Sequence, residues 1–547
     1  MEQRAHAYLE NQKVTFELCV EALQSGCELL VIPELFSSGY LFPSFLDALQ
    51  FAETSTGPTF YRIFELAKNY LATIVYGYVE YDQKTKRLHN SAAVVNQNGL
   101  VTNYRKLMTY VSDTIWATDG DQMPPIFQVN GVDATVMICA DAEFPELSAQ
   151  RNNFDPSIIC LPTAWVDENC PSMTWWARVR ESSSFMIAAD LAGVEHGVQF
   201  SGGTSILSPS GDVLAKIDTG SGWISAELEF ETRQSPKYET LSASLFLSTS
   251  TFSSQDLSIR VPTSIPGPRN GTLHIAALGG SNRQSLEEMC EVLANSSFFN
   301  QDISLGSDTL IVTIPSHLES DPSNDAAVDQ LLAQTVQRCL KQTSYTDIII
   351  NVITQTLDGQ KTYRSATRDQ LHKSSLPDKL PVLQTAAGFP YSLLSCADLS
   401  SWSTCRDSSI NGSLLLCISM SACVDWPVVK KQSSDIGLPP FPDHDLANTF
   451  NIARVRAGEN NVAICVASSD SSATSIPSGV YGPDFFRYPY AESLMTPDQT
   501  GIHMTCLTVD NSPLLATNSE TKNFSFVAYE KPYLRRRKPW IYASVQE

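Results

Sequence analysis

Residues 136–146 read Val-Met-Ile-Cys-Ala-Asp-Ala-Glu-Phe-Pro-Glu. An apolar run typical of a buried strand ends at Cys139, and three acids follow it closely: Asp141, Glu143 and Glu146. A thiol in this place is either a small core residue or a nucleophile, because α/β proteins assemble their sites where strands end. Residues 396–398 repeat the tripeptide Cys-Ala-Asp, so Cys396 is likewise either a core residue or a nucleophile.

The sequence around this stretch alternates between segments with the apolar spacing of a helix and short apolar runs typical of strands. Helical spacing predicts helices over 4–25, 58–70 and 172–184, and short apolar runs predict strands over 28–33, 71–79, 91–97, 101–104, 133–138, 158–161 and 185–190. Strands that alternate with helices are typical of layered α/β domains.

The chain has 547 residues, which is too long for one ordinary hydrophobic core. The alternating pattern degrades into Ser, Thr, Pro and Gly over 229–271 and restarts at 272. We therefore predict a first domain over 1–228, a linker or surface arm over 229–271, and a second domain over 272–547 that includes a C-terminal tail.

Four pairs of short, similar sequence motifs occur in the same order in the two predicted domains, which favours a tandem duplication. They are Leu30-Val-Ile-Pro33 with Val312-Thr-Ile-Pro315, Tyr104-Arg105 with Tyr363-Arg364, Cys139-Ala-Asp141 with Cys396-Ala-Asp398, and Ala177-Arg-Val-Arg180 with Ala453-Arg-Val-Arg456. The second copy opens with an apolar strand over 272–278, whereas the first opens directly with a helix. The first copy is therefore predicted to lack its opening strand.

Composition excludes several classes of partner. A formal charge of −22 disfavours nucleic acid. No apolar stretch approaches the roughly 20 residues of a membrane-spanning helix, and the N-terminus lacks the apolar core of a secretion signal. The 13 cysteines form no CxxC pairs, which disfavours a metal site or a disulfide framework. These observations predict a cytoplasmic protein with reduced thiols, no metal, no nucleic-acid partner and no membrane partner.

Three polar residues of the first domain stand where predicted strands end: Glu34, Lys106 and Cys139. Cysteine is a strong nucleophile only as a thiolate, so it needs a base, and Glu34 could take its proton and later hand one to a leaving amine. Lys106 could stabilise the oxyanion of a tetrahedral intermediate together with the backbone N–H of Ala140. These residue types suit acyl transfer from an amide.

Four words carry a family resemblance: PELFSSGY (33–40), RLHNSAAVVNQNGLVTNYRK (87–106), CADAEFPE (139–146) and FSGGTSILSPSGDVLA (200–215). In order and spacing they resemble the nitrilase, or carbon–nitrogen hydrolase, superfamily over residues 4–228. The resemblance implies an α-β-β-α sandwich and a Glu-Lys-Cys triad carried by Glu34, Lys106 and Cys139. The implied reaction uses neither a metal nor an organic cofactor.

The resemblance also points to two further positions. Many amidase-type members have a second acid seven residues before a loop-closing glycine, and Asp113 stands seven residues before Gly120. Asp113 is shorter than the usual Glu, so it is either a site residue or a loop cap. Trp165 follows the next strand and is either a wall of the substrate pocket or a core aromatic.

The second copy has lost the polar residues that accompany the cysteine. Ser316 stands where the repeat places Glu34, and Ser365 stands where it places Lys106. Cys396 is therefore expected to be unreactive, and the second domain to be a degenerate nitrilase-like sandwich. Members of the superfamily pair through their helical faces, so the two copies are expected to form an internal pseudodimer, with further homo-oligomerisation left open.

The residues after Cys139 resemble the amidase and carbamoylase branches, because the nitrile-cleaving members typically have Trp-Glu where this chain has Ala140-Asp141. We expect a hydrolase of a small amide or N-carbamoyl compound that works through a Cys thioester and releases ammonia. A nitrilase or an amide-transferring enzyme is the first alternative. A catalytically inactive binding or scaffold protein is the alternative of another class.

Overall fold

The structure is a computed structural model. It describes residues 8–148, 156–166, 170–230, 271–279, 285–296, 309–319, 325–343, 345–356, 360–375, 382–386, 388–421, 426, 429–430, 449–470, 476–482, 493–494, 501–510 and 524–528. Nearly all of the predicted linker and all of the C-terminal tail beyond residue 528 lie outside the described residues.

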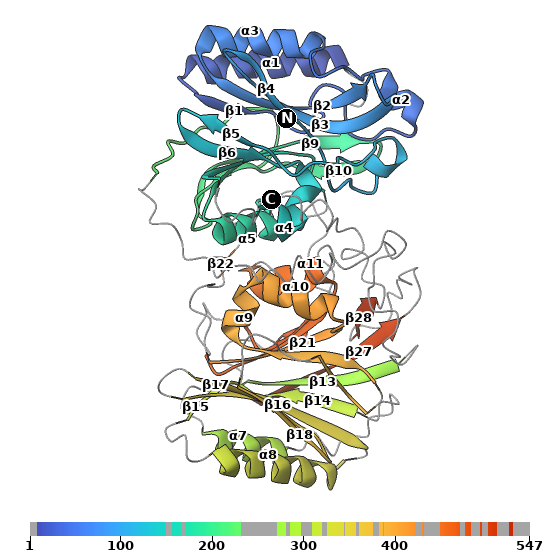
Figure 1. The fold of residues 1–547 in the computed structure, drawn as a ribbon, viewed down its shortest axis with the longest axis vertical. Helices are drawn as coiled ribbons and strands as arrows, with labels where there is room; N and C mark the ends of the chain where they lie inside the picture. Colours follow the sequence, from blue (N-terminus) through green and yellow to red (C-terminus); the bar gives the residue numbers. More distant parts are fainter. Residues whose placement is uncertain are drawn as a thin grey trace. The chain divides into compact units, whose positions relative to one another are not determined.

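The described residues form two compact units, one up to residue 230 and one from residue 271 onward (Figure 1). Each unit has a layer of helices, two facing sheets and a second layer of helices. The α/β class and the sandwich architecture predicted for the first domain are therefore confirmed. The predicted domain boundaries and the pseudodimer remain predictions.

In the first unit, one helical layer covers a four-stranded sheet. The helices are α1 (Tyr8–Gln24) and α3 (Pro58–Tyr70), with the short α2 (Phe45–Leu49) at the side, and the strands are β1 (Leu29–Val31), β2 (Thr73–Asp82), β3 (Arg87–Asn96) and β4 (Gly99–Arg105). β1 runs parallel to β2, and the other neighbours are antiparallel.

The second sheet of the first unit has six strands in the order β12-β11-β8-β7-β6-β5. They are β5 (Ile126–Val129), β6 (Val132–Val136), β7 (Ile158–Thr163), β8 (Phe185–Asp190), β11 (Thr204–Leu207) and β12 (Val213–Ile217). β6, β7 and β8 are parallel, so their carboxyl ends lie at one edge. α4 (Pro145–Ser148) and α5 (Met173–Ser182) form the outer layer, and β9 (Ala192–Glu195) pairs with β10 (Val198–Ser201) beside the sheet.

Local sequence explains where α3 begins and ends. Pro58 occupies the first turn, where its missing N–H costs no hydrogen bond, and Leu71 closes the helix in a left-handed conformation. The apolar face of α3 then packs on the sheet through Ile63 and Ala67, which are fully buried against Ile74 of β2. The amphipathic helix is thus held by the sheet that it covers.

The second unit repeats the layers. Its first sheet contains β13 (Gly271–Gly279), β14 (Thr309–Thr313), β15 (His317–Glu319), β16 (Asp347–Thr356), β17 (Lys361–Ala366), β18 (Leu371–Ser374), β27 (Gly501–Asp510) and β28 (Phe524–Ala528), covered by α7 (Leu286–Ala294) and α8 (Asp325–Leu340). Its second sheet contains β19 (Leu383–Gln384), β20 (Pro390–Leu394), β21 (Leu415–Met420), β24 (Ala463–Ser468), β25 (Gly479–Tyr481) and β26 (Ser493–Leu494), covered by α9 (Cys396–Ser400), α10 (Trp402–Ile410) and α11 (Ile452–Asn460). A further two-stranded pair joins β22 (Val429–Lys430) and β23 (Thr449–Phe450).

The two units agree in strand order and direction. The sheet order β4-β3-β2-β1 of the first unit matches β18-β17-β16-β14 of the second, with the same parallel and antiparallel neighbours. The order β5-β6-β7-β8-β11-β12 matches β19-β20-β21-β24-β25-β26 in the same way. This agreement supports the predicted duplication, which remains a prediction. The second unit's first sheet continues past β14 into β13 and β27, whereas the first unit's described sheet ends at β1.

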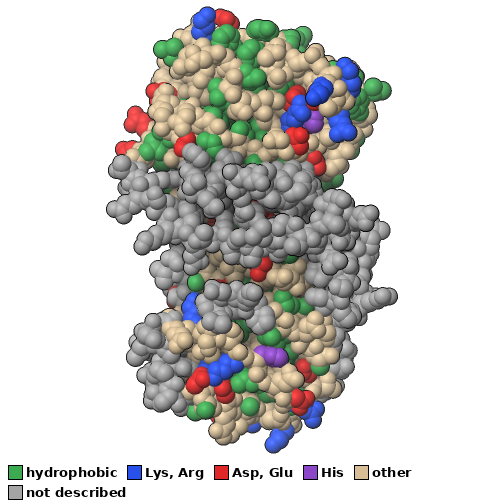
Figure 2. All heavy atoms as spheres, in the orientation of Figure 1, with side chains coloured by type: hydrophobic (Ala, Val, Ile, Leu, Met, Phe, Trp, Pro, Cys, Tyr) green, Lys and Arg blue, Asp and Glu red, His purple; other side chains and the backbone are tan. Residues whose placement is uncertain are grey.

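Within the described residues, no helix combines the length and apolar character needed to cross a bilayer. Acidic and basic side chains both occur on the surface of each unit in the face that Figure 2 shows.

Candidate active site

The structure brings Glu34, Lys106 and Asp113 together as one buried charge network. Glu34 lies just beyond β1, Lys106 just beyond β4, and Asp113 opens a short 3-10 helix (Asp113–Ile115). The Lys106 Nζ lies 2.7 Å from Glu34 Oε1 and 2.7 Å from Asp113 Oδ2, and all three side chains are fully buried. Such a network persists in a core because each charge has a partner. Asp113 therefore does more than cap a loop, since its carboxylate contacts the lysine directly.

Asn90, in the middle of β3, completes this network. Its Nδ2 donates to Glu34 Oε1 at 2.7 Å and to Asp113 Oδ1 at 3.3 Å. Its backbone carbonyl also accepts the Lys106 N–H at 2.8 Å. Asn90 lies in the stretch over 87–106 that carries part of the family resemblance, but no role was predicted for it. The available signal was the run of three polar residues, His89, Asn90 and Ser91, directly before the apolar run Ala92–Val95.

Cys139 begins the turn after β6, a 3-10 helix over Cys139–Glu143. Its backbone has φ of +46°, a left-handed conformation that is unfavourable for a side chain bearing a Cβ. Burial raises the pKa of the thiol well above its ordinary value, and the charge of Glu34 adds to this rise, whereas Lys106 opposes it. Glu34 and Lys106 therefore both act electrostatically on the sulfur.

Two neighbours on β7 and just after it also act on Cys139. The hydroxyl of Thr163 and the backbone N–H of Ala164 lower the pKa of the thiol and so favour its anion. Thr163 Oγ1 is buried and forms no hydrogen bond within the described residues. Neither residue was expected as part of the site, although both directly precede Trp165, the tryptophan that was predicted for the pocket.

The acid two residues beyond the thiol, Asp141, has a positioning role. Its carboxylate accepts hydrogen bonds from the Tyr104 hydroxyl at 2.9 Å and from the backbone N–H groups of Met108 at 2.8 Å and Ile138 at 2.9 Å. Asp141 thus ties the loop after Lys106 to the turn that carries Cys139. Burial raises the pKa of its carboxyl to about 6, which these donors oppose.

Glycines allow the strands to approach the site closely. A Cβ added at Gly77 of β2 would lie 2.7 Å from the Cα of Glu34, and one at Gly120 would lie 2.2 Å from the backbone oxygen of Arg105. Gly120 also donates its N–H to the Lys106 carbonyl at 2.8 Å, so it closes the loop that begins near Asp113. Only glycine fits these two places without moving Glu34 or the strand before Lys106.

The other predicted site residues, Ala140 and Trp165, are buried. Ala140 follows Cys139 in the same turn and is 1% exposed. Trp165 is 5% exposed, and its ring packs edge-on against Trp175 with centroids 5.4 Å apart. The backbone N–H of Trp165 donates to Asp190 Oδ1 at 2.8 Å. Tyr40, which was not expected, places its ring centroid 5.6 Å from the Lys106 Nζ. Its hydroxyl has no hydrogen-bond partner in the described part of the chain.

The matching residues of the second unit form no such network. Ser365 Oγ lies 2.8 Å from the Tyr391 hydroxyl, and Cys396 occupies the first turn of α9 behind the capping residue Ser395. Cys396 is half-exposed and helical, so it lacks the strained backbone of Cys139. Lys361 Nζ donates to Ser395 Oγ at 3.0 Å, so a lysine contacts the residue that precedes Cys396.

The chain is similar to known proteins over part of its length. The sequence model of the carbon–nitrogen hydrolase family matches residues 1–238. The chain is similar to a nitrilase of Pyrococcus abyssi (30% identity over 207 residues, 38% of this chain and 78% of the relative) and to an (R)-stereoselective amidase of Pseudomonas sp. (27% over 190 residues, 34% and 68%). A solved amidase structure from Nesterenkonia sp. matches with 21% identity, 40% coverage of this chain, 84% of that chain, and a TM-score of 0.36. The chain therefore belongs to the carbon–nitrogen hydrolase family of the nitrilase superfamily, and it is a hydrolase of C–N bonds.

Proposed function

We propose that this protein hydrolyses a small amide or N-carbamoyl compound through a thioester on Cys139 and releases ammonia. The observation that carries the proposal is the buried network of Glu34, Lys106 and Asp113, which acts on a thiol held in a left-handed turn. A base, a cation and a nucleophile in one desolvated place are the groups that acyl transfer from nitrogen needs.

In the first half of the reaction, the Cys139 sulfur attacks the substrate carbonyl carbon while its proton passes to Glu34. The raised pKa of the thiol means that the proton leaves during the attack rather than before it. Glu34 Oε2 is the suitable acceptor, because Oε1 is engaged by Lys106 and Asn90 whereas Oε2 has no partner in the described structure. Lys106 uses two of its three N–H groups on carboxylates, which leaves one for the oxyanion beside the Ala140 N–H.

In the second half, the intermediate collapses and the C–N bond breaks. Glu34 gives its proton to the departing nitrogen, so ammonia leaves and an acyl thioester remains on Cys139. Glu34 then takes a proton from a water molecule as this water attacks the thioester carbonyl. The C–S bond breaks, and the sulfur recovers the proton from Glu34. One water is consumed for each ammonia released, and the enzyme returns to its starting state.

The substrate class can be tested by measuring ammonia release from three matched panels: small primary amides, N-carbamoyl amino acids and aliphatic nitriles. We expect turnover of an amide or carbamoyl panel and little of the nitriles, as Ala140-Asp141 follows the nucleophile instead of Trp-Glu. The similarity to the Pyrococcus nitrilase favours the nitriles as the second candidate. Transfer of the acyl group to hydroxylamine in preference to water would indicate an amide-transferring enzyme. If no compound of any panel is turned over, the proposal is contradicted, and a catalytically inactive binding or scaffold protein is favoured instead.

The pH dependence of the reaction should report the state of Glu34. Burial raises the pKa of this carboxyl, Lys106 lowers it, and the negative charge of Asp113 raises it again. Because protonated Glu34 cannot accept the thiol proton, we expect kcat/KM to fall as the pH drops through this raised pKa. Asp113→Asn removes a charge that raises it, so the acid limb should move to lower pH. An acid limb that stays in place in Asp113→Asn would show that the limb does not report Glu34.

Asn90 is proposed as a positioning residue that holds Glu34. A hydrogen bond to a charged group contributes about 1.5–3 kcal/mol, so Asn90→Ala should lower kcat roughly 10- to 100-fold. The KM should change little if Asn90 does not contact the substrate. The neighbouring Ser91→Ala is the matched control, because Ser91 donates to Glu80 at 2.6 Å and not to the site. Equal loss of activity in both variants would indicate a general effect on β3.

A further inference from the structure

The hairpin of β9 and β10 buries a carboxylate and exposes a valine. Glu195 ends β9 and is 2% exposed, whereas the adjacent Val194 is 55% exposed. The turn that follows consists of His196 and Gly197, which both have positive φ and are both exposed. Carboxylates are seldom fully buried unless hydrogen bonds compensate their charge. The burial of Glu195 therefore directs attention to the groups that its carboxylate binds.

The Glu195 carboxylate accepts two consecutive backbone N–H groups from the segment that follows Glu34. Tyr40 N–H donates to Oε2 at 2.9 Å, and Leu41 N–H donates to Oε1 at 3.1 Å. Gly39 has φ of +85°, and a Cβ added there would lie 2.8 Å from Oε1, so the carboxylate fits against this glycine. Two hydrogen bonds to one charged group fix both the position and the direction of the backbone. We call this pair of hydrogen bonds the Glu195 clamp.

The hairpin that carries the Glu195 clamp is itself attached to the loop after β7. Ser201 N–H donates to the Trp165 carbonyl at 2.8 Å. Phe200 of β10 also forms an isolated antiparallel bridge with Val166. The clamp therefore ties the segment after β1, in the first sheet, to the loop after β7, in the second sheet.

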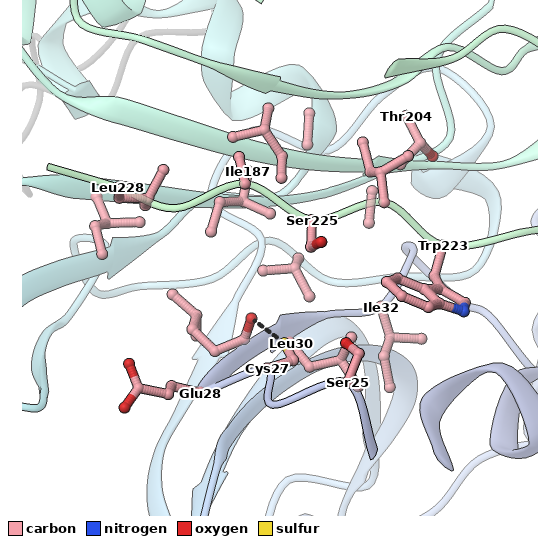
Figure 3. Close-up of a pocket in the computed structure, with 18 of the residues that line it drawn as sticks. Ser25, Cys27, Glu28, Leu30, Ile32, Ile187, Thr204, Trp223, Ser225 and Leu228 are labelled. Atoms are coloured by element: carbon pink, nitrogen blue, oxygen red, sulfur yellow. Dashed lines mark hydrogen bonds between the residues drawn. The ribbon is translucent and has the colours of Figure 1, made fainter. Parts of the chain in front are cut away.

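The strand that leads into the clamped segment gives it little support. β1 has three half-buried residues, and β2 is its one neighbour among the described strands. A cavity of about 660 Å³ lies along β1, and Ile32 and Pro33 are among the residues that line it (Figure 3). Glu34 follows Pro33 directly. The course of the backbone from Glu34 to Leu41 therefore depends on contacts beyond the strand, such as the Glu195 clamp.

Tyr40 connects the Glu195 clamp to Lys106. The Tyr40 ring packs edge-on against Phe200 with centroids 5.9 Å apart, and the Lys106 Nζ lies 5.6 Å from the centroid of the Tyr40 ring. Because Tyr40 is buried, its ring excludes water from this side of the ammonium. A charge that is shielded from water acts more strongly on an oxyanion near it. Displacement of the ring would hydrate Lys106 and weaken this effect.

We propose that Glu195 is a positioning residue for the reaction: it holds the backbone of Tyr40 so that the ring stays beside Lys106. The ammonium then meets the oxyanion in a place from which water is excluded. This inference rests on the proposed function, since it depends on the role of Lys106 in the transition state. The oxyanion forms only after the attack on the carbonyl, so loss of the clamp should lower kcat and leave KM nearly unchanged.

The test begins with Glu195→Gln in the complete chain. Glutamine has the same length but one acceptor oxygen, so one of the two backbone N–H groups loses its partner. We expect kcat for ammonia release, measured well below the unfolding transition, to fall roughly tenfold, with KM changed less than about twofold. Hydrogen exchange at the amides of Tyr40 and Leu41 should become faster, which shows directly that the clamp has opened.

Glu53→Gln is the matched control. Glu53 Oε2 also accepts a backbone N–H, from Thr59 at 2.7 Å, and a Cβ added at Gly57 would lie 2.9 Å from the same oxygen. The other oxygen, Oε1, accepts the Tyr8 hydroxyl at 2.8 Å, so this carboxylate binds the helical layer through α1 and α3. The control should keep its kcat, although exchange at the Thr59 amide should become faster. An equal fall of kcat in both variants would overturn the proposal, because it would indicate a general effect of losing a buried carboxylate.

A double-mutant cycle with Tyr40→Leu shows whether Glu195 acts through Tyr40. Tyr40→Leu removes the ring and should itself lower kcat. Adding Glu195→Gln to this variant should then lower kcat by less than about a further twofold, because no ring remains to be positioned. Losses that multiply would overturn the proposal, as would a Glu195→Gln enzyme with the kcat of the wild type. A wild-type enzyme that turns over none of the panels would instead contradict the proposed function, and this proposal with it.

Discussion

Cys139→Ala is expected to reduce ammonia release at least about 10⁴-fold while leaving the fold intact. Removal of a nucleophile costs the whole covalent pathway, and only binding and oxyanion stabilisation remain. Cys139 is 5% exposed, and alanine lacks only the sulfur, so the strained turn should persist. The measurement is steady-state ammonia release, with mass analysis of the denatured wild-type protein during turnover to locate the acyl group on Cys139.

The matched control is Cys396→Ala, which changes the same Cys-Ala-Asp word in the second unit. Cys396 lies in a regular helix without the carboxylate and lysine network, so this variant should retain full activity. Activity that survives Cys139→Ala would contradict the mechanism for any substrate. Loss of activity in Cys396→Ala, with activity retained in Cys139→Ala, would show that the reaction takes place in the second unit.

Lys106→Met should damage both stability and activity. The two carboxylates at 2.7 Å would lose their shared cation in a fully buried place. Breaking a buried pair in this way costs about 3–5 kcal/mol, because an uncompensated charge remains. The oxyanion would also lose a donor, which typically lowers kcat about 10²- to 10³-fold. Denaturant unfolding measures the first effect, and ammonia release measured well below the unfolding transition measures the second.

Two further variants separate these effects. Lys106→Met combined with Asp113→Asn removes one buried negative charge, so part of the lost stability should return while the activity stays low. Arg105→Met changes the preceding residue, whose guanidinium pairs with Glu80 at 2.6 Å outside the site. It should lose less stability and keep its activity. A double variant that regained activity together with stability would show that Lys106 is purely structural.

The regular elements of the first unit could be predicted closely because their periods are local properties. The helix predicted over 58–70 and the strand predicted over 185–190 have the observed bounds. The second unit was harder, and α8 (Asp325–Leu340) and α10 (Trp402–Ile410) were not predicted. In both helices, polar residues stand among the apolar ones, so the helical period is weak in the sequence. These helices are stabilised by packing one face against a sheet, which the sequence does not show.

The sequence by itself determined the layered fold and the positions of Glu34, Lys106 and Cys139 at strand ends, because strand and helix periods are written in neighbouring residues. Only the tertiary structure decided how these residues work together. Glu34 meets Lys106 across 72 positions and Asn90 across 56, and sheet register sets such pairings. The tertiary structure likewise distinguished the two cysteine words: Cys139 has a left-handed backbone, whereas Cys396 starts a helix. Identical tripeptides adopt different backbones because the surrounding packing, and not the tripeptide, supplies the energy that holds a strained turn.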